Sequence, residues 1–306
     1  MSSVIVLGPT GGVGSAVALT AQKHGAKVYL AMRDTKKSIP GLSPTDEEQG
    51  AFERLQADLT DAQSVSAAIE ASGAKRAFIY LAHGSPDHMK ATLQAMRSAG
   101  VEFVVLLSSY TVWEKLQDVP ASELIPYAHA QVEMILDEVF GTENYVALRP
   151  GGFATNLLRF KGGVAAGEVK MFDGHLKFDC ITPGDIGRVG GTILVQGPRN
   201  GQTKVYLYGP QVITQREAIG IIGKVLGKEI KITTIGEEEA KAQYLENGLP
   251  KPIVEYFIRV VKEHEEGEMQ KRVHYETGVD NVQLYTGFPA TSFEQWVREN
   301  EDLFKA

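Results

Sequence analysis

The stretch VIVLGPTGGVGSAVALTAQKHGAKVYLAMRD, residues Val4–Asp34, places four glycines within seven residues, between a short apolar run and a helical pattern. Glycine disfavours the interiors of helices and strands, so such a cluster marks a place where the backbone approaches something closely. Gly8, Gly11 and Gly14 form the pattern G-x-x-G-x-x-G. We interpret the stretch as a first strand, a tight turn and the start of a helix.

The glycine pattern at this junction predicts a dinucleotide-binding loop. Where the first strand of a dinucleotide fold ends, backbone N–H groups and a helix N-terminus face the pyrophosphate of the cofactor. The alternative is a tight turn without a ligand, but the strand before the pattern and the helix after it favour the dinucleotide. The residues of this loop that we expect to contact the cofactor are Gly8, Thr10, Gly11, Gly12, Val13 and Gly14.

The order of the other segments predicts an α/β fold with a doubly wound, Rossmann-like parallel sheet. Apolar runs without alternation are typical of parallel strands that are covered on both faces, and helical stretches separate them here. The expected strands are 4–7, 27–32, 78–82, 103–107 and 145–148, and the expected helices are 15–24, 62–71, 87–99 and 128–140. Strands that alternate with helices in this way define the doubly wound class.

The chain changes character near residue 150, where the pattern becomes less regular and richer in glycine. Helices are expected there over 214–226, 237–247, 252–266 and 292–300. We therefore predict two parts: residues 1–149 as the dinucleotide-binding half, and residues 150–306 as a smaller, mainly helical lobe that binds the substrate.

The composition restricts the partners of the protein. With 306 residues, 43% apolar and 23% charged, the chain predicts an ordinary globular protein. A formal net charge of -7 gives no general attraction to nucleic acid or to acidic membrane surfaces. We therefore expect a small-molecule substrate, no nucleic acid and no membrane, and leave the oligomeric state open.

Location and metal binding follow from what the sequence lacks. Cys180 is the only cysteine, so no intrachain disulfide can form, and the start MSSVIVLG has no secretory pattern. No run approaches the roughly 18 apolar residues that a membrane span needs. The seven histidines show no H-E-x-x-H spacing and the chain has no C-x-x-C. The sequence thus predicts a cytoplasmic protein without a metal site.

The end of the second expected strand, LAMRDTKK, bears on which dinucleotide is bound. Arg33 and Lys37 could both pair with the 2′-phosphate of NADPH or NADP⁺, whereas an acidic residue there would bind the ribose of NAD. Asp34 could be that acid if the strand ends one residue later than expected. The third alternative is that these residues form a solvated loop without a role in binding. Asp58 and Leu59, after a further expected strand, are predicted to edge the adenine, although Asp58 could simply cap a helix.

Six motifs together resemble those of the NmrA-like family of atypical short-chain dehydrogenases, and within it the sequence is similar to fungal alkaloid-pathway reductases such as clavine dehydrogenases. The motifs are GPTGGVG (8–14), MRD (32–34), ADLTD (57–61), FVVLLSSYTV (103–112), LRPGGFATNLL (148–158) and ITPGDIGRV (181–189). Members of the family return to the sheet after leaving it. The resemblance therefore implies a returning strand at KVYLYG, residues 204–209, that interweaves the lobe with the sheet.

The resemblance also implies catalytic positions. Many relatives carry a lysine near the nicotinamide on the helix after the fifth strand, and His129 stands at that position here. A second alignment compares this helix with the Tyr-x-x-x-Lys pattern of short-chain dehydrogenases. There Tyr127 and Gln131 have the spacing of the pattern, but Gln131 stands in place of the lysine. His129 could hydrogen-bond the nicotinamide ribose, could protonate a substrate because its ordinary pKa suits that role, or could be a helix-surface histidine without a role.

Four further residues are candidates by their place near strand ends. His83 follows the fourth expected strand, where it could line the ligand or belong to a simple turn. Ser108 and Tyr110 end the fifth strand at the carboxyl edge, on which doubly wound sheets bind ligands. We expect Ser108 to contact the cofactor and Tyr110 to be a catalytic residue. By the resemblance, Phe153 of the RPGGF motif supplies an apolar wall beside the nicotinamide.

Two classes of function fit these residues. The first is an NADPH-dependent reductase of an iminium, conjugated C=C or carbonyl compound in fungal-type secondary metabolism, such as an indole-alkaloid-like substrate, with an accompanying ring-forming step as a variant. Loss of the lysine favours the iminium, because its product amine needs no proton in the same step. The second is a non-catalytic regulator that senses NADP(H) and acts through a protein partner.

Overall fold

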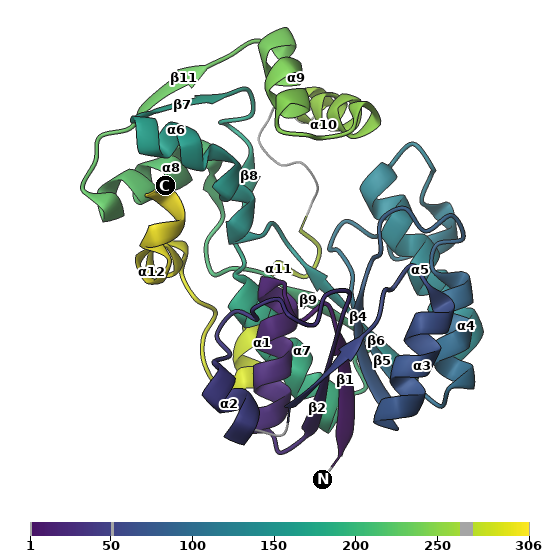
Figure 1. The fold of residues 1–306 in the computed structure, drawn as a ribbon. Coiled ribbons are helices and arrows are strands. Elements are labelled where there is room, and N and C mark those ends of the chain that lie inside the picture. Colours follow the sequence, from purple (N-terminus) through teal and green to yellow (C-terminus); the bar gives the residue numbers. More distant parts are fainter. Residues whose placement is uncertain (1, 50–51, 264–271, 306) are drawn as a thin grey trace. The chain divides into compact units, whose positions relative to one another are not determined.

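The computed structural model describes residues 2–49, 52–263 and 272–305, which fall into two compact units (Figure 1). Unit 1 comprises Met1–Pro150, Pro183–Leu207 and Glu276–Pro289. Unit 2 comprises Gly151–Thr182, Tyr208–Tyr275 and Ala290–Ala306. The sequence predicts a lobe over 150–306 that is interwoven with the sheet through a returning strand at 204–209. In the structure, 183–207, which include the strand Lys204–Leu207, and 276–289 group with the sheet.

In the described part of unit 1, seven strands form one parallel sheet in the order β3-β2-β1-β4-β5-β6-β9. Their bounds are β1 Ser3–Leu7, β2 Lys27–Met32, β3 Phe52–Gln56, β4 Arg76–Tyr80, β5 Phe103–Leu107, β6 Tyr145–Pro150 and β9 Lys204–Leu207. The predicted doubly wound fold is confirmed. The strand order reverses between β1 and β4, and such a switch point is where these sheets bind ligands.

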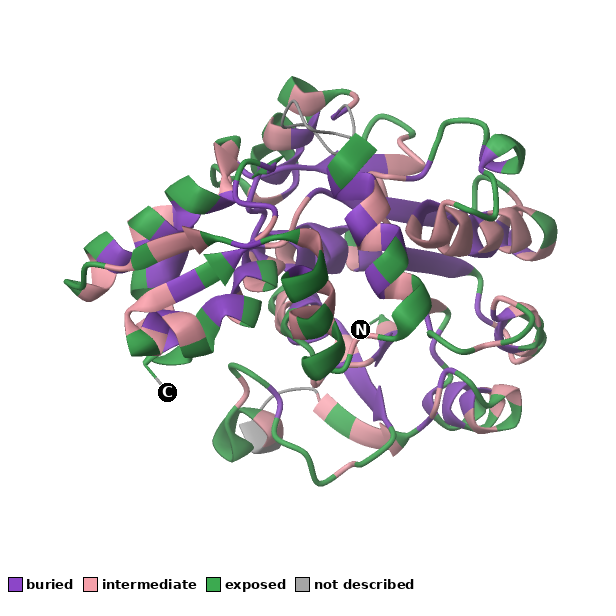
Figure 2. Cartoon of the chain, turned by 90° about the horizontal axis from the view of Figure 1, so that it is seen from above, coloured by how far each residue is buried: buried purple, intermediate pink, exposed green. Residues whose placement is uncertain are grey.

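Helices cover both faces of this sheet. On one face α3, α4 and α5 pack side by side, and on the other α1 packs against α7 (Figure 1). The bounds in unit 1 are α1 Gly12–Lys23, α2 Pro44–Gln49, α3 Ala62–Ser72, α4 Lys90–Ser98, η1 Leu116–Asp118, α5 Leu124–Phe140 and α7 Pro183–Gln196, with most of α11 Tyr275–Thr286. The central strands are buried along their length, as the apolar runs predicted (Figure 2).

Helix α7 was not predicted, and its glycines explain why. A Cβ on Gly187 would lie 2.3 Å from Cβ of Ala16, and one on Gly191 would lie 2.6 Å from Cβ of Thr20. Glycine lowers helix propensity, yet here it lets two helix backbones approach closely. Tertiary packing therefore decides this helix and holds 183–196 in unit 1.

Unit 2 is mainly helical. Its helices are η2 Ala154–Phe160, α6 Lys161–Ala166, α8 Gln215–Leu226, α9 Glu237–Glu246, α10 Lys251–Glu263, α12 Phe293–Glu299 and η3 Glu301–Phe304. Two short strand pairs complete its described part: β7 (Glu168–Met171) with β11 (Lys231–Thr234), and β8 (Lys177–Phe178) with β10 (Ile213–Thr214). The helix predicted over 252–266 corresponds to α10, and residues 264–266 lie outside the described residues.

Within the described residues, the structure contains no helix that is both long and apolar enough to span a membrane.

Candidate dinucleotide and active site

The glycine loop at the end of β1 is a closed turn that only glycine can form at its first position. Gly8 has a φ of +76°, and its N–H donates to the carbonyl of Ala31 at 3.0 Å. A Cβ on Gly8 would lie 2.4 Å from Cε1 of Tyr80. Left-handed backbone and close contact both require the missing side chain.

The middle of the loop leads into α1 with its backbone exposed. Gly11 is the N-cap of α1 in an extended conformation, and both Gly11 and Gly12 are exposed. N–H groups in the first turn of a helix have no intrahelical partner, so they offer donors to an anion at the switch point. The side chain of Val13 is buried, which leaves its backbone for a cofactor. This geometry suits a pyrophosphate.

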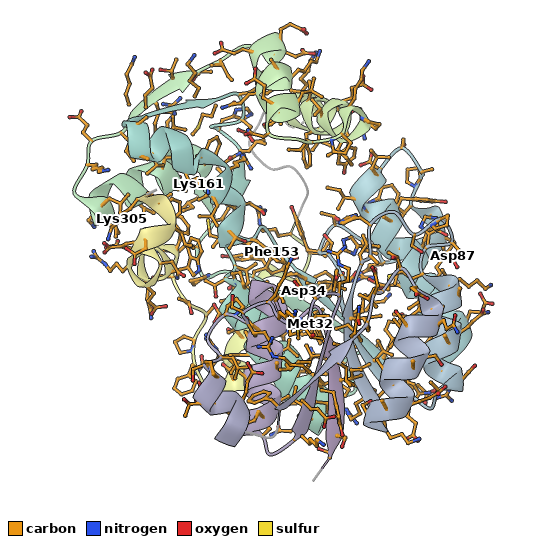
Figure 3. All side chains as sticks on the ribbon, viewed as in Figure 1. Met32, Asp34, Asp87, Phe153, Lys161 and Lys305 are labelled. Atoms are coloured by element: carbon orange, nitrogen blue, oxygen red, sulfur yellow. The ribbon has the colours of Figure 1, made fainter. Side chains whose placement is uncertain are left out.

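The charges at the carboxyl ends of β2 and β3 lie close together. Arg33 follows β2 and is exposed, and its charge contributes to lowering the pKa of Asp58, after the larger effect of hydrogen bonds from Thr60. Asp34 has a local role, because its carboxylate accepts the N–H of Lys36 at 3.0 Å; Figure 3 labels Asp34 just beyond Met32. Because the carboxylate of Asp34 already stabilises its own loop, Asp34 is a weaker candidate for binding the ribose of NAD.

Hydrogen bonds to backbone carbonyls hold the loops that carry Lys37 and Leu59. Lys37 is exposed, and its carbonyl accepts from Nη1 of Arg54 at 2.7 Å. Leu59 is buried, and its carbonyl accepts from the hydroxyl of Thr92 at 3.0 Å. The loops after β2 and β3 are therefore anchored while the ammonium group of Lys37 stays accessible.

Histidine and tyrosine side chains gather where β4 ends and α5 begins. The ring of His88 meets the ring of Tyr127 edge-on, with centroids 5.8 Å apart. His88 and the following Met89 have φ values of 52° and 70°. Backbone strain of this kind persists where the surroundings enforce it, often at functional sites. His88 is not among the residues predicted for the site, although it lies in the same HGSPDH segment as His83.

His129 lies on the first half of α5 with one buried ring nitrogen. Its Nδ1 has no hydrogen-bond partner among the described residues. Burial lowers the pKa of His129 to about 4, and the charges of His83 and Arg149 act in the same direction. The imidazole is therefore neutral near neutral pH. A neutral ring hydrogen-bonds but is a poor proton donor, so the geometry favours the positioning role over the protonating one.

The lowered pKa of His129 makes stability pH-dependent. Unfolded histidine takes up its proton near pH 6.5 and folded His129 only near 4, so the unfolded state holds more protons between these values and stability falls as pH drops. His129→Asn should remove about 1–2 kcal/mol of the stability difference between about pH 7.5 and pH 5. Urea unfolding at both pH values measures it. His175→Asn, at an exposed histidine, is the control, and an unchanged pH dependence in His129→Asn would contradict the expectation.

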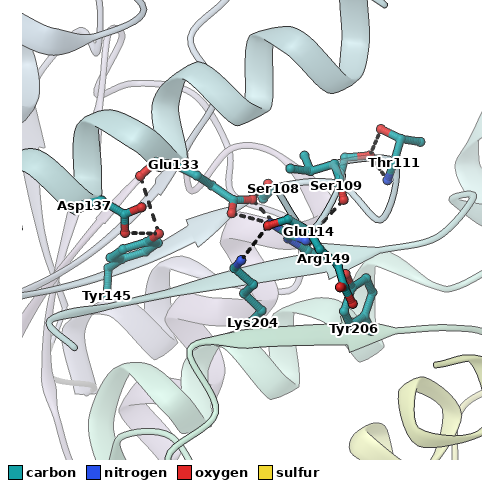
Figure 4. Close-up of polar contacts among 11 residues, drawn as sticks. Ser108, Ser109, Thr111, Glu114, Glu133, Asp137, Tyr145, Arg149, Lys204 and Tyr206 are labelled. Carbon is teal, nitrogen blue, oxygen red and sulfur yellow. Dashed lines mark hydrogen bonds and ion pairs between the residues drawn. The ribbon is translucent and has the colours of Figure 1, made fainter. Parts of the chain in front are cut away.

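A buried ion pair joins α5 to β6 (Figure 4). Arg149 of β6 and Glu133 of α5 are both fully buried, and Nη2 of Arg149 lies 2.6 Å from Oε2 of Glu133. Nη1 of Arg149 donates to the carbonyl of Val112 at 3.2 Å and to the hydroxyl of Tyr206 at 3.0 Å. The guanidinium thus joins α5, β6, β9 and the segment after β5.

Ser108 belongs to this network. Its hydroxyl is buried and donates to Oε1 of Glu133 at 2.5 Å, and its N–H donates to the carbonyl of Leu148 at 2.8 Å. Both donors of Ser108 are therefore engaged inside unit 1, and its contact with the dinucleotide stays a prediction.

The remaining predicted residues fall in both units. Tyr110 is half-buried, and its N–H donates to the carbonyl of Pro150 at 3.1 Å. His83 is exposed just beyond β4. Phe153 lies in unit 2, where it precedes η2 and forms a bridge with Ile181 (Figure 3). The other candidates therefore belong to unit 1, whereas Phe153 belongs to unit 2.

The RPGGF turn is tied to a buried carboxylate in unit 2. Asp179 accepts the N–H of Gly152 and the N–H of Gly209, both at 3.0 Å, and Nε of Arg272 at 3.3 Å. The side chain of Asp179 is fully buried and that of Arg272 is 5% exposed. No signal for this arrangement was drawn from the sequence, because the three partners are distant in the chain.

The described residues contain no group of three or more His, Cys, Asp or Glu side chains that could hold a metal ion.

The seven-stranded order, the switch point and the glycine loop define a Rossmann-type α/β protein. The chain belongs to the NmrA-like family, whose model matches residues 1–297. It is 35% identical over 322 aligned positions to the nitrogen metabolite regulation-like protein bik4 of Gibberella fujikuroi, with 97% of this chain and 96% of that protein covered.

More distant relatives include named enzymes and a regulator. The chain is 26% identical over 302 positions to the (4-alkanoyl-5-oxo-2,5-dihydrofuran-3-yl)methyl phosphate reductase of Streptomyces griseus, covering 98% and 99% of the two chains. Triphenylmethane reductase of Citrobacter, solved with NADP(H), has a TM-score of 0.72 at 18% identity, covering 98% and 99%. The negative transcriptional regulator NmrA has a TM-score of 0.71 at 16% identity, covering 97% and 95%. Both of these solved structures have the same fold as this chain.

Proposed function

We propose that the protein is an NADPH-dependent reductase of a small organic substrate. The observation that carries the proposal is the exposed Gly11–Gly12 backbone at the start of α1, with the guanidinium of Arg33 at the next strand end. The first feature suits a pyrophosphate and the second a 2′-phosphate. The reductases among the relatives, one of them solved with NADP(H), support the same assignment.

The residues of this chain would hold and orient the cofactor, which when bound supplies a hydride. Backbone N–H groups of the glycine loop bind the pyrophosphate, Arg33 and Lys37 bind the 2′-phosphate, and Asp58 lies beside the adenine. Neutral His129 hydrogen-bonds the nicotinamide ribose or the substrate, with Tyr127 and Tyr110 beside it. His83 lines the same edge.

The chemistry of this cluster favours substrates that need no strong acid. An iminium carbon accepts hydride directly and its nitrogen needs no proton in that step, whereas a ketone oxygen needs a donor worth about 10²–10⁴-fold in rate. His129 with a pKa of about 4 is a poor donor, and no lysine stands at position 129 or 131. We therefore place iminium and conjugated substrates first, including alkaloid-like compounds whose reduction precedes ring closure.

The experiment offers purified protein NADPH together with a cyclic iminium salt, a quinone, an unsaturated lactone and a ketone. Oxidation of NADPH is followed by its absorbance, with turnover expected for the iminium or a conjugated acceptor. Binding of NADPH without turnover of any acceptor would overturn the reductase and leave the second candidate. Failure to bind either NADPH or NADP⁺ would overturn both.

That second candidate is a non-catalytic regulator that senses NADP(H) and acts through a protein partner. The similarity to a nitrogen metabolite regulation-like protein and the missing lysine favour it. A sensor must bind the oxidised and reduced cofactors with different affinities, because only a difference in affinity shifts a conformational equilibrium. Calorimetric titration with NADP⁺ and NADPH measures that difference.

Cofactor selectivity gives a direct test of Arg33. Arg33→Ala is expected to weaken NADPH about ten- to a hundredfold, because a charge-assisted contact is worth about 1.5–3 kcal/mol. NADH has no 2′-phosphate and should bind the variant as it binds the wild type. Lys75→Ala removes another exposed cation, before β4 at the opposite edge of the sheet, and should leave both affinities unchanged. Equal wild-type affinities for NADPH and NADH would remove the argument.

A further inference from the structure

We propose that the Arg149–Glu133 ion pair is a positioning device that fixes the segment after β5 and the first half of α5, so that Tyr110, Tyr127 and His129 keep one arrangement. This inference rests on the proposed reductase. The segment after β5, residues 108–115, is called the β5 loop below.

Three contacts anchor the β5 loop, and two of them come from the ion pair. Arg149 donates to the carbonyl of Val112 at 3.2 Å, and Glu133 accepts the hydroxyl of Ser108 at the start of the loop at 2.5 Å. A second cation, Lys204 of β9, donates from Nζ to the carbonyl of Glu114 at 3.4 Å (Figure 4). Tyr110 lies between these anchors.

The same pair fixes the rotation of α5. Glu133 follows His129 by four residues, so the two lie on one face of the helix. Glu133 is bound by both Nε and Nη2 of Arg149, at 3.2 and 2.6 Å. A bidentate contact restrains orientation as well as distance, which a single contact does not. Rotation of α5 that displaced His129 would break this fork.

Stability alone does not account for such a pair. Burying two charges costs as much as their attraction returns, and a well-packed apolar pair of similar volume is often as stable or more so. Arg149, however, uses its remaining nitrogen Nη1 on Val112 and Tyr206, which an apolar residue cannot contact by hydrogen bonds. What the pair adds beyond stability is a defined place for the loop and the helix.

The test replaces the pair without leaving a buried charge, in the double variant Arg149→Met/Glu133→Leu. We expect it to fold and to bind NADPH within about threefold of wild type, while kcat for the accepted substrate falls about thirty- to a hundredfold, since small misplacements cost that much. Arg76→Met is the matched control. Arg76 is a half-buried arginine of the same sheet that donates to the carbonyls of Ile193 and Leu194, and kcat should not change.

A second readout does not depend on activity. The chain has two tryptophans, and Trp113 lies in the β5 loop beside Val112. Trp113 is 43% exposed in the structure. In a Trp296→Phe background, its quenching by acrylamide should rise about 1.5- to twofold in the double variant and stay unchanged in Arg76→Met, because a released loop exposes more of its side chains.

The outcomes separate the two proposals. If wild type reduces none of the acceptors, the reductase fails, and Trp113 quenching alone decides the positioning role. A folded double variant with wild-type quenching and wild-type kcat overturns the positioning device. Should the double variant not fold, Tyr206→Phe removes one acceptor of Arg149 and is measured in the same way: a loss of kcat of at least about threefold or increased quenching supports the device, and no change in either overturns it.

Discussion

Gly14→Ala is expected to lower the free energy of unfolding by about 3 kcal/mol or more and to weaken NADPH at least about a hundredfold. A Cβ at this position would lie 2.2 Å from the carbonyl oxygen of Gly8 and 3.2 Å from Cα of Pro9. Both neighbours are backbone atoms, so no side chain can rotate away and the loop itself must shift. Because the loop also presents its N–H groups to the pyrophosphate, stability and affinity fall together.

Gly11→Ala is the matched control in the same loop. A Cβ on Gly11 would lie 3.7 Å from the carbonyl oxygen of Gly8, which is an ordinary contact. Its φ of -88° suits alanine, so the free energy of unfolding should change by less than about 1 kcal/mol. Urea unfolding and NADPH titration of both variants measure the effects. Equal stabilities of Gly14→Ala and Gly11→Ala would show that the close contact does not decide the loop.

The sequence predicted those parts of the fold that local patterns encode. Continuous apolar runs such as 27–32 and 103–107 became buried strands with the predicted bounds. The glycine pattern was informative because Gly8 and Gly14 are required by a positive φ and a backbone contact within the same fourteen residues. Helix α7 was missed because its glycines are explained by contacts with α1, about 170 residues away in the chain.

The site was less predictable because its chemistry depends on burial and on distant partners. Charged residues are usually exposed, so nothing in the sequence marked Glu133 and Arg149 as a buried pair. Ser108 was placed at the correct strand end, but whether its hydroxyl faced outward or toward Glu133 depended on α5. The pKa of His129 likewise follows from the burial of its ring. The remaining assignments of cofactor and catalytic residues stay predictions.

Unit 2 depends on Asp179 in a way that makes its substitution costly. The two oxygens of this buried carboxylate accept from Gly152, Gly209 and Arg272. Asp179→Asn places an amide nitrogen where only donors converge, and it leaves the guanidinium of Arg272, 5% exposed, without its counter-charge. Breaking a buried pair in this way costs about 3–5 kcal/mol. We expect a loss of that size in the free energy of unfolding of unit 2.

Trp296 provides the measurement for this unit. It packs between Phe293 and Phe304 in the core of unit 2, so in a Trp113→Phe background its fluorescence reports urea unfolding there. Asp302→Asn, at an exposed carboxylate 3.1 Å from Nζ of Lys305, is the control and should change stability by less than about 0.5 kcal/mol. The double variant Asp179→Leu/Arg272→Met removes both charges and should recover part of the loss, because no uncompensated charge remains buried. If Asp179→Asn were no less stable than Asp302→Asn, the carboxylate would not be the centre that holds the RPGGF turn.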